Sequence, residues 1–202
     1  MKTFLAIGGG TVAAVGVAAV VAVSLTQPGD ALAACRDGQV AGSIGGPFTL
    51  VNGRGETVTD ADVITKPSLI YFGYTFCPDV CPIDTVRNAE AVDLLAEQGH
   101  DVTPVFISID PERDTPEIMA DYAFNMHEDM IALTGSPEQV RAASQAYKTY
   151  YQAQDTGDEF YLVDHSTFTY LVMPETGFAE FFRNDVTAEA MAERVACFVD
   201  AA

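Results

Sequence analysis

The distribution of apolar residues predicts a chain in which strands and helices alternate. Residues 68–72 form a continuous apolar run, which is typical of a strand buried on both faces. Residues 103–109 form a second run of this kind. Upstream, residues 47–58 alternate around Asn52 and Gly53, and an Asn-Gly pair between apolar strands indicates a hairpin.

Two helix starts follow the second buried strand. Thr115 is a capping residue followed by Pro116, which suits the first turn of a helix. Ser136 and Gln139 have the spacing of a capping box. Near the end of the chain, residues 191–199 carry an apolar stripe at helical spacing, so an amphipathic helix is expected there.

The remaining apolar segments are short and predict further strands, at residues 130–133, 160–163, 167–173 and 178–182. The turn at residues 174–177 joins the last two as a hairpin. The order is a hairpin, then strands alternating with helices, then antiparallel strands and a helix. This order predicts an α/β sandwich with a mixed sheet.

A longer apolar block lies at the start of the chain. Residues 4–25 contain no charged side chain over 22 positions, which matches the roughly 20 apolar residues of a membrane-spanning helix. Lys2 precedes the block and Asp30 follows it, a charge order that places the N-terminus in the cytoplasm. We therefore expect residues 1–34 to form a membrane anchor with a linker, and residues 35–202 to form one exported domain.

Two alternatives to an uncleaved anchor stay open. Residues 31–33 resemble a small-residue cleavage site, and residues 32–35 resemble a bacterial lipobox in which Cys35 would be acylated. In all three cases the domain lies in the periplasm, at the bacterial inner membrane or released from it. That compartment is oxidising, so each cysteine is read as a disulfide, a metal ligand or a redox centre.

The charge balance narrows the choice of partners. The chain has 29 acidic and 10 basic side chains, a formal net charge of -19. Such a surface excludes nucleic acid as a partner, because binding a polyanion requires a basic surface. It also disfavours docking on anionic lipid. Positively charged partners or metal ions fit better.

The strongest chemical signal lies at the end of the first buried strand, where Cys77 and Cys81 stand four positions apart. A proline follows each cysteine and disfavours helical geometry there, so both are expected in a loop ahead of a helix. The positive end of that helix lowers thiol pKa values. Paired thiolates are soft ligands for copper(I), zinc or an iron-sulfur cluster. A plain disulfide is a further alternative, but so short a loop gains little chain entropy.

Of the three histidines, His165 is the candidate for completing a metal site. It lies between two apolar strands and follows Asp164, a carboxylate that could orient the imidazole. The alternative is a histidine that only satisfies its hydrogen bonds at a strand end. His100 and His127 both have acidic neighbours, and we expect them to be solvated.

Three segments in this order resemble the signatures of one family. They are FGYTFCPDVCP at residues 72–82, ISIDPERDTP at residues 107–116 and VDH at residues 163–165. Together they resemble the Sco/SenC family, which consists of membrane-tethered, thioredoxin-like copper proteins needed to assemble the copper centres of respiratory oxidases. The likeness runs from about Gly46 to Phe198.

The resemblance implies a fold and a ligand set. The fold would be a thioredoxin-like sandwich, with a mixed central sheet flanked by helices, an N-terminal β-hairpin and an extra β-hairpin insertion. One copper ion per chain, as copper(I) or copper(II), would be bound by Cys77, Cys81 and His165. Asp164 would orient the histidine, and the segment around Asp110 would have a structural role.

The resemblance also implies a function and partners. The protein would be a metallochaperone and not an enzyme, which receives copper from an upstream periplasmic donor. It would deliver the copper to the copper-receiving subunit of a respiratory haem-copper oxidase, or prepare that subunit for it. A thiol-disulfide oxidoreductase that keeps target cysteines reduced is the alternative, although such catalysts usually carry one residue fewer between their cysteines. A peroxidase is a weaker third option.

The other two cysteines, Cys35 and Cys197, flank the exported domain. In an oxidising compartment, a disulfide between them that joins the two ends is the leading hypothesis. If Cys35 is acylated instead, Cys197 would remain as an apolar core thiol.

Overall fold

The computed structural model of the chain describes residues 31–36, 43–154, 157 and 160–202. In these residues, seven strands form a mixed sheet in the order β2-β1-β5-β4-β3-β8-β9, and β6 and β7 form a separate pair. The strands are β1 Thr49–Asn52, β2 Thr57–Thr59, β3 Ser68–Gly73, β4 Thr103–Ser108, β5 Ile131–Thr134, β6 Tyr151–Ala153, β7 Val163–His165, β8 Thr169–Met173 and β9 Gly177–Phe182. The helices are η1 Ala31–Ala34, α2 Asp60–Val63, α3 Val80–Glu97, α4 Pro116–Met126, α5 Pro137–Ala146 and α6 Ala188–Asp200.

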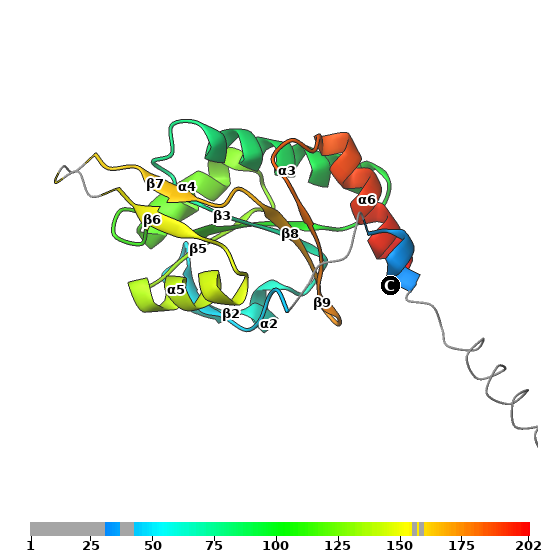
Figure 1. Cartoon of the computed structure of the whole chain (residues 1–202), viewed down its shortest axis with the longest axis horizontal. Helices are drawn as coiled ribbons and strands as arrows, with labels where there is room; N and C mark the ends of the chain where they lie inside the picture. Colours follow the sequence, from blue (N-terminus) through cyan, green and yellow to red (C-terminus); the bar gives the residue numbers. More distant parts are fainter. Residues whose placement is uncertain (1–30, 37–42, 155–156, 158–159) are drawn as a thin grey trace, which may run out of the picture.

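Strand β3 lies inside the large sheet and all six of its residues are buried. It pairs in parallel with β4 and antiparallel with β8. Helices α3, α4 and α6 lie on one face of this sheet, and α5 with the short α2 lies on the other (Figure 1). The predicted α/β sandwich with a mixed sheet is therefore confirmed.

The core between the sheet and α6 is built from the apolar positions that the sequence pattern selects. Leu69, Leu171 and Phe182 from the sheet belong to one buried cluster with Met191 and Phe198 of α6. A fully buried side chain of this size stabilises a fold by about 1.5 to 3 kcal/mol. The stripe over residues 191–199 thus attaches the last helix to the sheet.

The predicted helix starts are confirmed in detail. The Thr115 hydroxyl accepts a hydrogen bond from the Ile118 N–H at the start of α4. At the start of α5, the Gln139 side chain accepts from the Ser136 N–H, while the Ser136 hydroxyl accepts from the Gln139 N–H. Each bond satisfies a donor that a helix end would otherwise leave without a partner.

Both predicted hairpins are also present, and most strand boundaries differ from the predicted ones by only one or two residues. Strands β1 and β2 pair antiparallel, and so do β8 and β9. The strand expected at residues 160–163 instead begins at Val163 and continues to His165. The preceding Tyr161 lies outside β7, and its carbonyl accepts a hydrogen bond from the Arg113 side chain.

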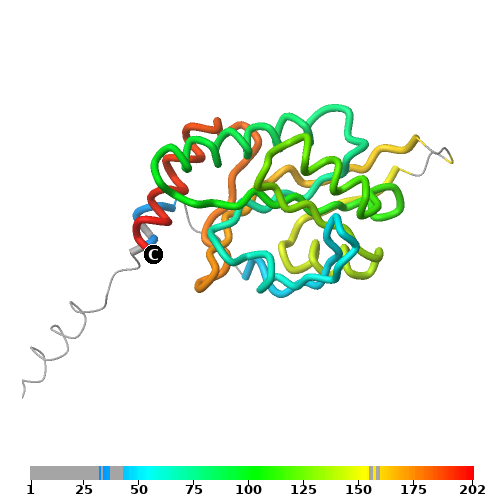
Figure 2. The backbone as a smooth tube through the Cα atoms, turned by 180° about the vertical axis from the view of Figure 1, so that it is seen from behind, coloured from blue at the N-terminus to red at the C-terminus, as the bar shows by residue number. Residues whose placement is uncertain are grey.

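A disulfide joins Cys35 to Cys197, two residues 162 positions apart, with their Cα atoms at 5.7 Å. It attaches η1 to α6, so the first described residues and the C-terminus lie together at one end of the molecule. The β6-β7 pair lies at the other end, as the view from behind also shows (Figure 2). Most of the segment predicted as an anchor, residues 1–30, lies outside the described residues, and within the described part no helix is long and apolar enough to cross a membrane.

Removing this disulfide should destabilise the domain strongly. For a closed loop of 162 residues, the chain-entropy relation gives about 5 kcal/mol, and native bridges typically contribute about 2 to 5 kcal/mol. We expect Cys197→Ser to lower the melting temperature by roughly 10 °C. Calorimetry under non-reducing conditions checks this, with Cys77→Ser as the control that leaves the bridge intact. Equal melting temperatures for the two variants would contradict the expectation.

Candidate metal centre

The sheet topology brings the cysteine segment and His165 to the same edge. Helix α3 follows the carboxyl end of β3, so Cys77 and Cys81 lie where β3 ends. Strand β8 runs antiparallel to β3, with Thr169 opposite Tyr71. The residues just before Thr169 must therefore also lie at the carboxyl end of β3. His165 precedes Thr169 by four positions, so it lies at this end of β3 as well, on the segment that leads into β8.

The two cysteines occupy different local structures. Cys77 lies in the loop after β3 and is half-buried, whereas Cys81 is completely buried in the first turn of α3. The expectation that both lie ahead of the helix is wrong for Cys81. Pro82 is tolerated inside the first turn because an N–H at that position would have no backbone partner within the helix. The N–H of Cys81 points to the Cys77 sulfur, at 3.4 Å.

Gly73 allows the Cys81 sulfur to approach the strand. A Cβ atom placed on Gly73 would lie 3.1 Å from the Cys81 sulfur and 2.8 Å from the Tyr71 ring. Both distances are shorter than ordinary contacts between such atoms. Glycine is therefore required at the end of β3 so that the buried sulfur can lie against the backbone.

A buried carboxylate fixes the start of the cysteine loop. Asp114 accepts hydrogen bonds from the Thr75 N–H and hydroxyl and from the Ser108 hydroxyl. It is completely buried, and burial raises its pKa although the hydrogen bonds oppose this effect. Asp114 lies just before α4, in the segment of residues 107–116. Through these hydrogen bonds it holds the start of the cysteine segment, residues 72–82, in place.

The imidazole of His165 has a defined tautomer. Its Nδ1 atom lies 2.8 Å from the carbonyl oxygen of Ser166, which can only accept, so Nδ1 carries the proton. Nε2 therefore presents its lone pair, and it lies 3.3 Å from the Cys81 sulfur. The orienting role predicted for Asp164 falls to this carbonyl, since the Asp164 carboxylate is exposed and accepts from the Gln154 side chain.

Among the residues that the structure describes, one group of histidine, cysteine and acidic side chains has ligand atoms close enough to share an ion. It consists of Cys77, Cys81 and His165, whose ligand atoms all lie within 4.8 Å of one another. Three donors about 2.0 to 2.3 Å from one ion stand roughly 4 Å apart. Two sulfurs and one imidazole nitrogen suit a soft ion such as copper(I). The three residues fit such an ion if the distances between their ligand atoms shorten slightly, from within 4.8 Å to roughly 4 Å.

Burial sets the protonation of this group. It raises the pKa of the Cys81 thiol far above its usual range. Burial also lowers the pKa of His165. At neutral pH the metal-free site thus holds a protonated Cys81 thiol and a neutral imidazole, so a metal ion must displace the thiol proton.

A buried polar network behind the site was not foreseen from the sequence. The Tyr71 hydroxyl donates to Asp84 at 3.0 Å, and Arg87 forms an ion pair with Asp84 at 3.1 Å. The ring of Tyr71 meets the ring of His165 edge to face. The only local signal was a pair of opposite charges three positions apart on a helix, a spacing that is common on exposed helix faces.

The other two histidines lie elsewhere. His127 contacts Asp93 at 3.2 Å, and His100 contacts Asp200 at 3.7 Å. Their side chains are 10% and 17% exposed, so the expectation of solvated rings is wrong.

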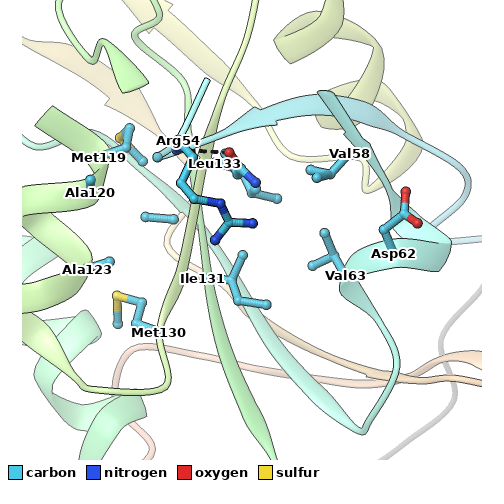
Figure 3. Close-up of a pocket in the computed structure, with 13 residues that line it drawn as sticks. Arg54, Val58, Asp62, Val63, Met119, Ala120, Ala123, Met130, Ile131 and Leu133 are labelled. Carbon is cyan, nitrogen blue, oxygen red and sulfur yellow. Dashed lines mark hydrogen bonds between the residues drawn. The ribbon is translucent and has the colours of Figure 1, made fainter. Parts of the chain in front are cut away.

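A hollow of about 320 Å³ lies at a different place, lined by residues of the β1-β2 hairpin, α2, α4 and β5. Arg54 extends across it, with Met119 and Ala123 on one side and Val58 and Val63 on the other (Figure 3). The metal centre is therefore not at the bottom of this hollow. The candidate site lies at the end of β3, where Cys77 and His165 are half-buried and Cys81 is completely buried.

The fold and the site define a class: a thioredoxin-like α/β protein with two cysteines at the start of a helix and a histidine brought beside them. The sequence pattern of the SCO1/SenC family matches residues 36–200. The chain is 55% identical to Protein SenC of Rhodobacter capsulatus over 199 residues, which cover 98% of this chain and 90% of that protein. The chain belongs to the SCO1/SenC family, so the predicted resemblance is confirmed.

Solved structures agree with this assignment. Arabidopsis thaliana ScoI with copper bound is similar with a TM-score of 0.75 and 39% identity, over 79% of this chain and 100% of that one. Bradyrhizobium japonicum ScoI with copper bound has a TM-score of 0.69 and 36% identity, over 76% of this chain and 98% of that one. BsSco, described as a member of the Sco family of cytochrome c oxidase assembly proteins, shares the fold at 22% identity, with a TM-score of 0.63 over 80% of this chain and 96% of that one.

Asp114→Ala should destabilise the domain and loosen the cysteine loop. The change leaves the half-buried donors of Thr75 and the buried Ser108 hydroxyl without their acceptor, and a buried donor without a partner costs about 1 to 3 kcal/mol. We expect the free energy of unfolding to fall by at least about 2 kcal/mol in urea titration. Asp121→Ala, an exposed carboxylate on α4, serves as the control and should change little. Equal stability of both variants would show that Asp114 does not fix the loop.

Proposed function

We propose that this protein is a copper metallochaperone, which binds one copper ion through Cys77, Cys81 and His165. The observation that carries the proposal is the cluster of two sulfurs and one unprotonated imidazole nitrogen at the end of β3. The copper-bound structures of two similar proteins support copper as the ion. The protein is then a carrier and not an enzyme, with copper as its cargo.

The proposed partners follow from this role. A periplasmic donor supplies the copper, and the copper-receiving subunit of a respiratory haem-copper oxidase accepts it or is prepared for it. Residues 1–34 anchor the protein in the bacterial inner membrane, with the domain of residues 35–202 in the periplasm. Support for the oxidase comes from the description of BsSco as an oxidase assembly protein. Support for the anchor is the uncharged apolar block at residues 4–25.

A thiol-disulfide reductase is the second candidate, favoured by the unequal exposure of the two cysteines. The half-buried Cys77 is accessible to a target disulfide, and the buried Cys81 lies close enough to resolve the mixed disulfide. In that reaction the two thiols give two electrons and two protons to the target and become a disulfide. Rapid reduction of insulin by the copper-free protein would favour this candidate over copper carriage.

Copper(I) titration against a competing chelator tests the proposed ligands. We expect one ion per chain for the native protein. Cys77→Ser, Cys81→Ser and His165→Ala should each weaken binding by at least the roughly 10- to 100-fold that loss of a ligand-orienting partner costs. His100→Ala is the matched control, because its ring contacts Asp200 outside the site. Native affinity in all three ligand variants would exclude the proposed site.

Copper affinity should depend on pH in a defined direction. Each thiol that loses a proton on binding makes the affinity fall about tenfold for every pH unit below its pKa. Because burial raises the pKa of Cys81, its proton must be displaced throughout the range from pH 5 to 8. Titrations at several pH values measure the slope, which should be smaller for Cys81→Ser. A flat profile for the native protein would contradict thiolate ligation.

A further inference from the structure

The histidine ligand lies on a strand that the main sheet does not hold. His165 ends β7, and β7 pairs only with β6 in the described structure. This two-stranded segment extends beyond the large sheet (Figure 1). The cysteines, in contrast, belong to the core: Cys77 lies in the loop between β3 and α3, and Cys81 lies in the first turn of α3. Contacts other than the sheet ladder must therefore hold His165 beside the cysteines.

Arg113, from the loop between β4 and α4, makes such a contact. Its guanidinium carbon lies 3.7 Å from the centre of the Tyr161 ring, a stacked arrangement. Its Nη1 atom donates to the Tyr161 carbonyl oxygen at 2.9 Å. One side chain thus holds both the ring and the backbone of the residue that lies two positions before β7.

Asp110 closes the arrangement from the other side. It accepts from the Arg113 Nε atom and, at 2.7 Å, from the Tyr161 hydroxyl. Asp110 is 4% exposed, so little water competes for these bonds. The pKa of Tyr161 is raised to about 12, first by burial, so its hydroxyl keeps the proton that it donates. Asp110, Arg113 and Tyr161 form a closed triangle, which we name the hairpin clamp.

The same guanidinium faces the loop that carries Cys77. It lies 5.0 Å from the centre of the Phe76 ring and 5.7 Å from that of Tyr74. Tyr74 in turn accepts a hydrogen bond from the Val163 N–H and meets the His165 ring edge to face at 5.8 Å. Arg113 therefore lies between the two segments that supply the ligands.

We propose that Arg113 is a positioning residue for the metal centre, which keeps His165 within bonding distance of the ion by holding Tyr161 against the cysteine loop. The proposal rests on the proposed copper site for its functional meaning. The position of Tyr161 against the cysteine loop, in contrast, should depend on Arg113 in the metal-free protein as well.

The chemistry of the clamp requires arginine. A guanidinium is planar, stacks on an aromatic ring and donates along several directions at once, to Asp110 and to the Tyr161 carbonyl here. An ammonium group carries the same charge but cannot stack in this way. Arg113→Lys should therefore keep the charge and lose the positioning. A loss of positioning in this variant would therefore show that the stacked guanidinium matters, and not only its positive charge.

The test compares Arg113→Lys and Arg113→Gln with His165→Ala in the full-length protein. Arg183→Gln is the matched control, since the side chain of Arg183 is 71% exposed. In the reduced, metal-free protein, nuclear Overhauser contacts between the His165 ring and the Tyr71 and Tyr74 rings should weaken in both Arg113 variants. Copper(I) affinity should fall roughly 10- to 100-fold, and X-ray absorption should show less nitrogen ligation.

A double variant shows whether Arg113 acts through the histidine. If it does, Arg113→Gln should add no further loss of affinity to His165→Ala. A further loss, or native ring contacts and affinity in both Arg113 variants, would overturn the inference. Native copper affinity in His165→Ala would instead overturn the proposed ligand set, whatever Arg113 does.

A second variant keeps the test valid if Arg113 variants do not fold. Tyr161→Leu removes the stacked ring and its hydroxyl but leaves the ion pair between Arg113 and Asp110 in place. It should reproduce the weakened ring contacts of His165 and the fall in copper affinity. Native values of both in a folded Tyr161→Leu protein would overturn the inference.

Discussion

The candidate metal centre depends on one short distance, the 3.3 Å between the Cys81 sulfur and the His165 Nε2 atom, which belong to residues 84 positions apart. Three features make this approach possible. The antiparallel pairing of β8 with β3 returns the chain to the carboxyl end of β3. The missing side chain of Gly73 lets the sulfur lie against the strand, and the Ser166 carbonyl turns the unprotonated nitrogen toward it.

Much of the scaffold could be predicted because its signals are local. The buried run of β3 and the caps at Thr115 and Ser136 each depend on a few adjacent residues, and the structure follows them closely. The class of fold followed from their order. Rules that describe an average preference did worse. The proline after Cys81 indicated a loop, but the first turn of a helix accepts proline without losing a backbone hydrogen bond within the helix.

The candidate ligands could be named from the sequence because their residue types and the three motifs are distinctive. Their surroundings could not. Arg113 and Tyr161 are 48 positions apart, and nothing near either residue indicates that they stack. The same holds for the Ser166 carbonyl, since every residue has one and only the fold decides which imidazole it meets. Asp164 was therefore the natural sequence-based choice for a role that the backbone performs.

The bridge between Cys35 and Cys197 also fixes where the proposed anchor would join the domain. Whatever precedes Ala31 joins the domain beside α6, while the ligand-bearing end of β3 and the β6-β7 pair lie at the opposite pole (Figure 1). An anchor at one end of the domain would leave the opposite end facing away from the membrane. With the proposed anchor at one end, the cysteine segment at the carboxyl end of β3 would therefore lie at the end of the domain that faces away from the membrane.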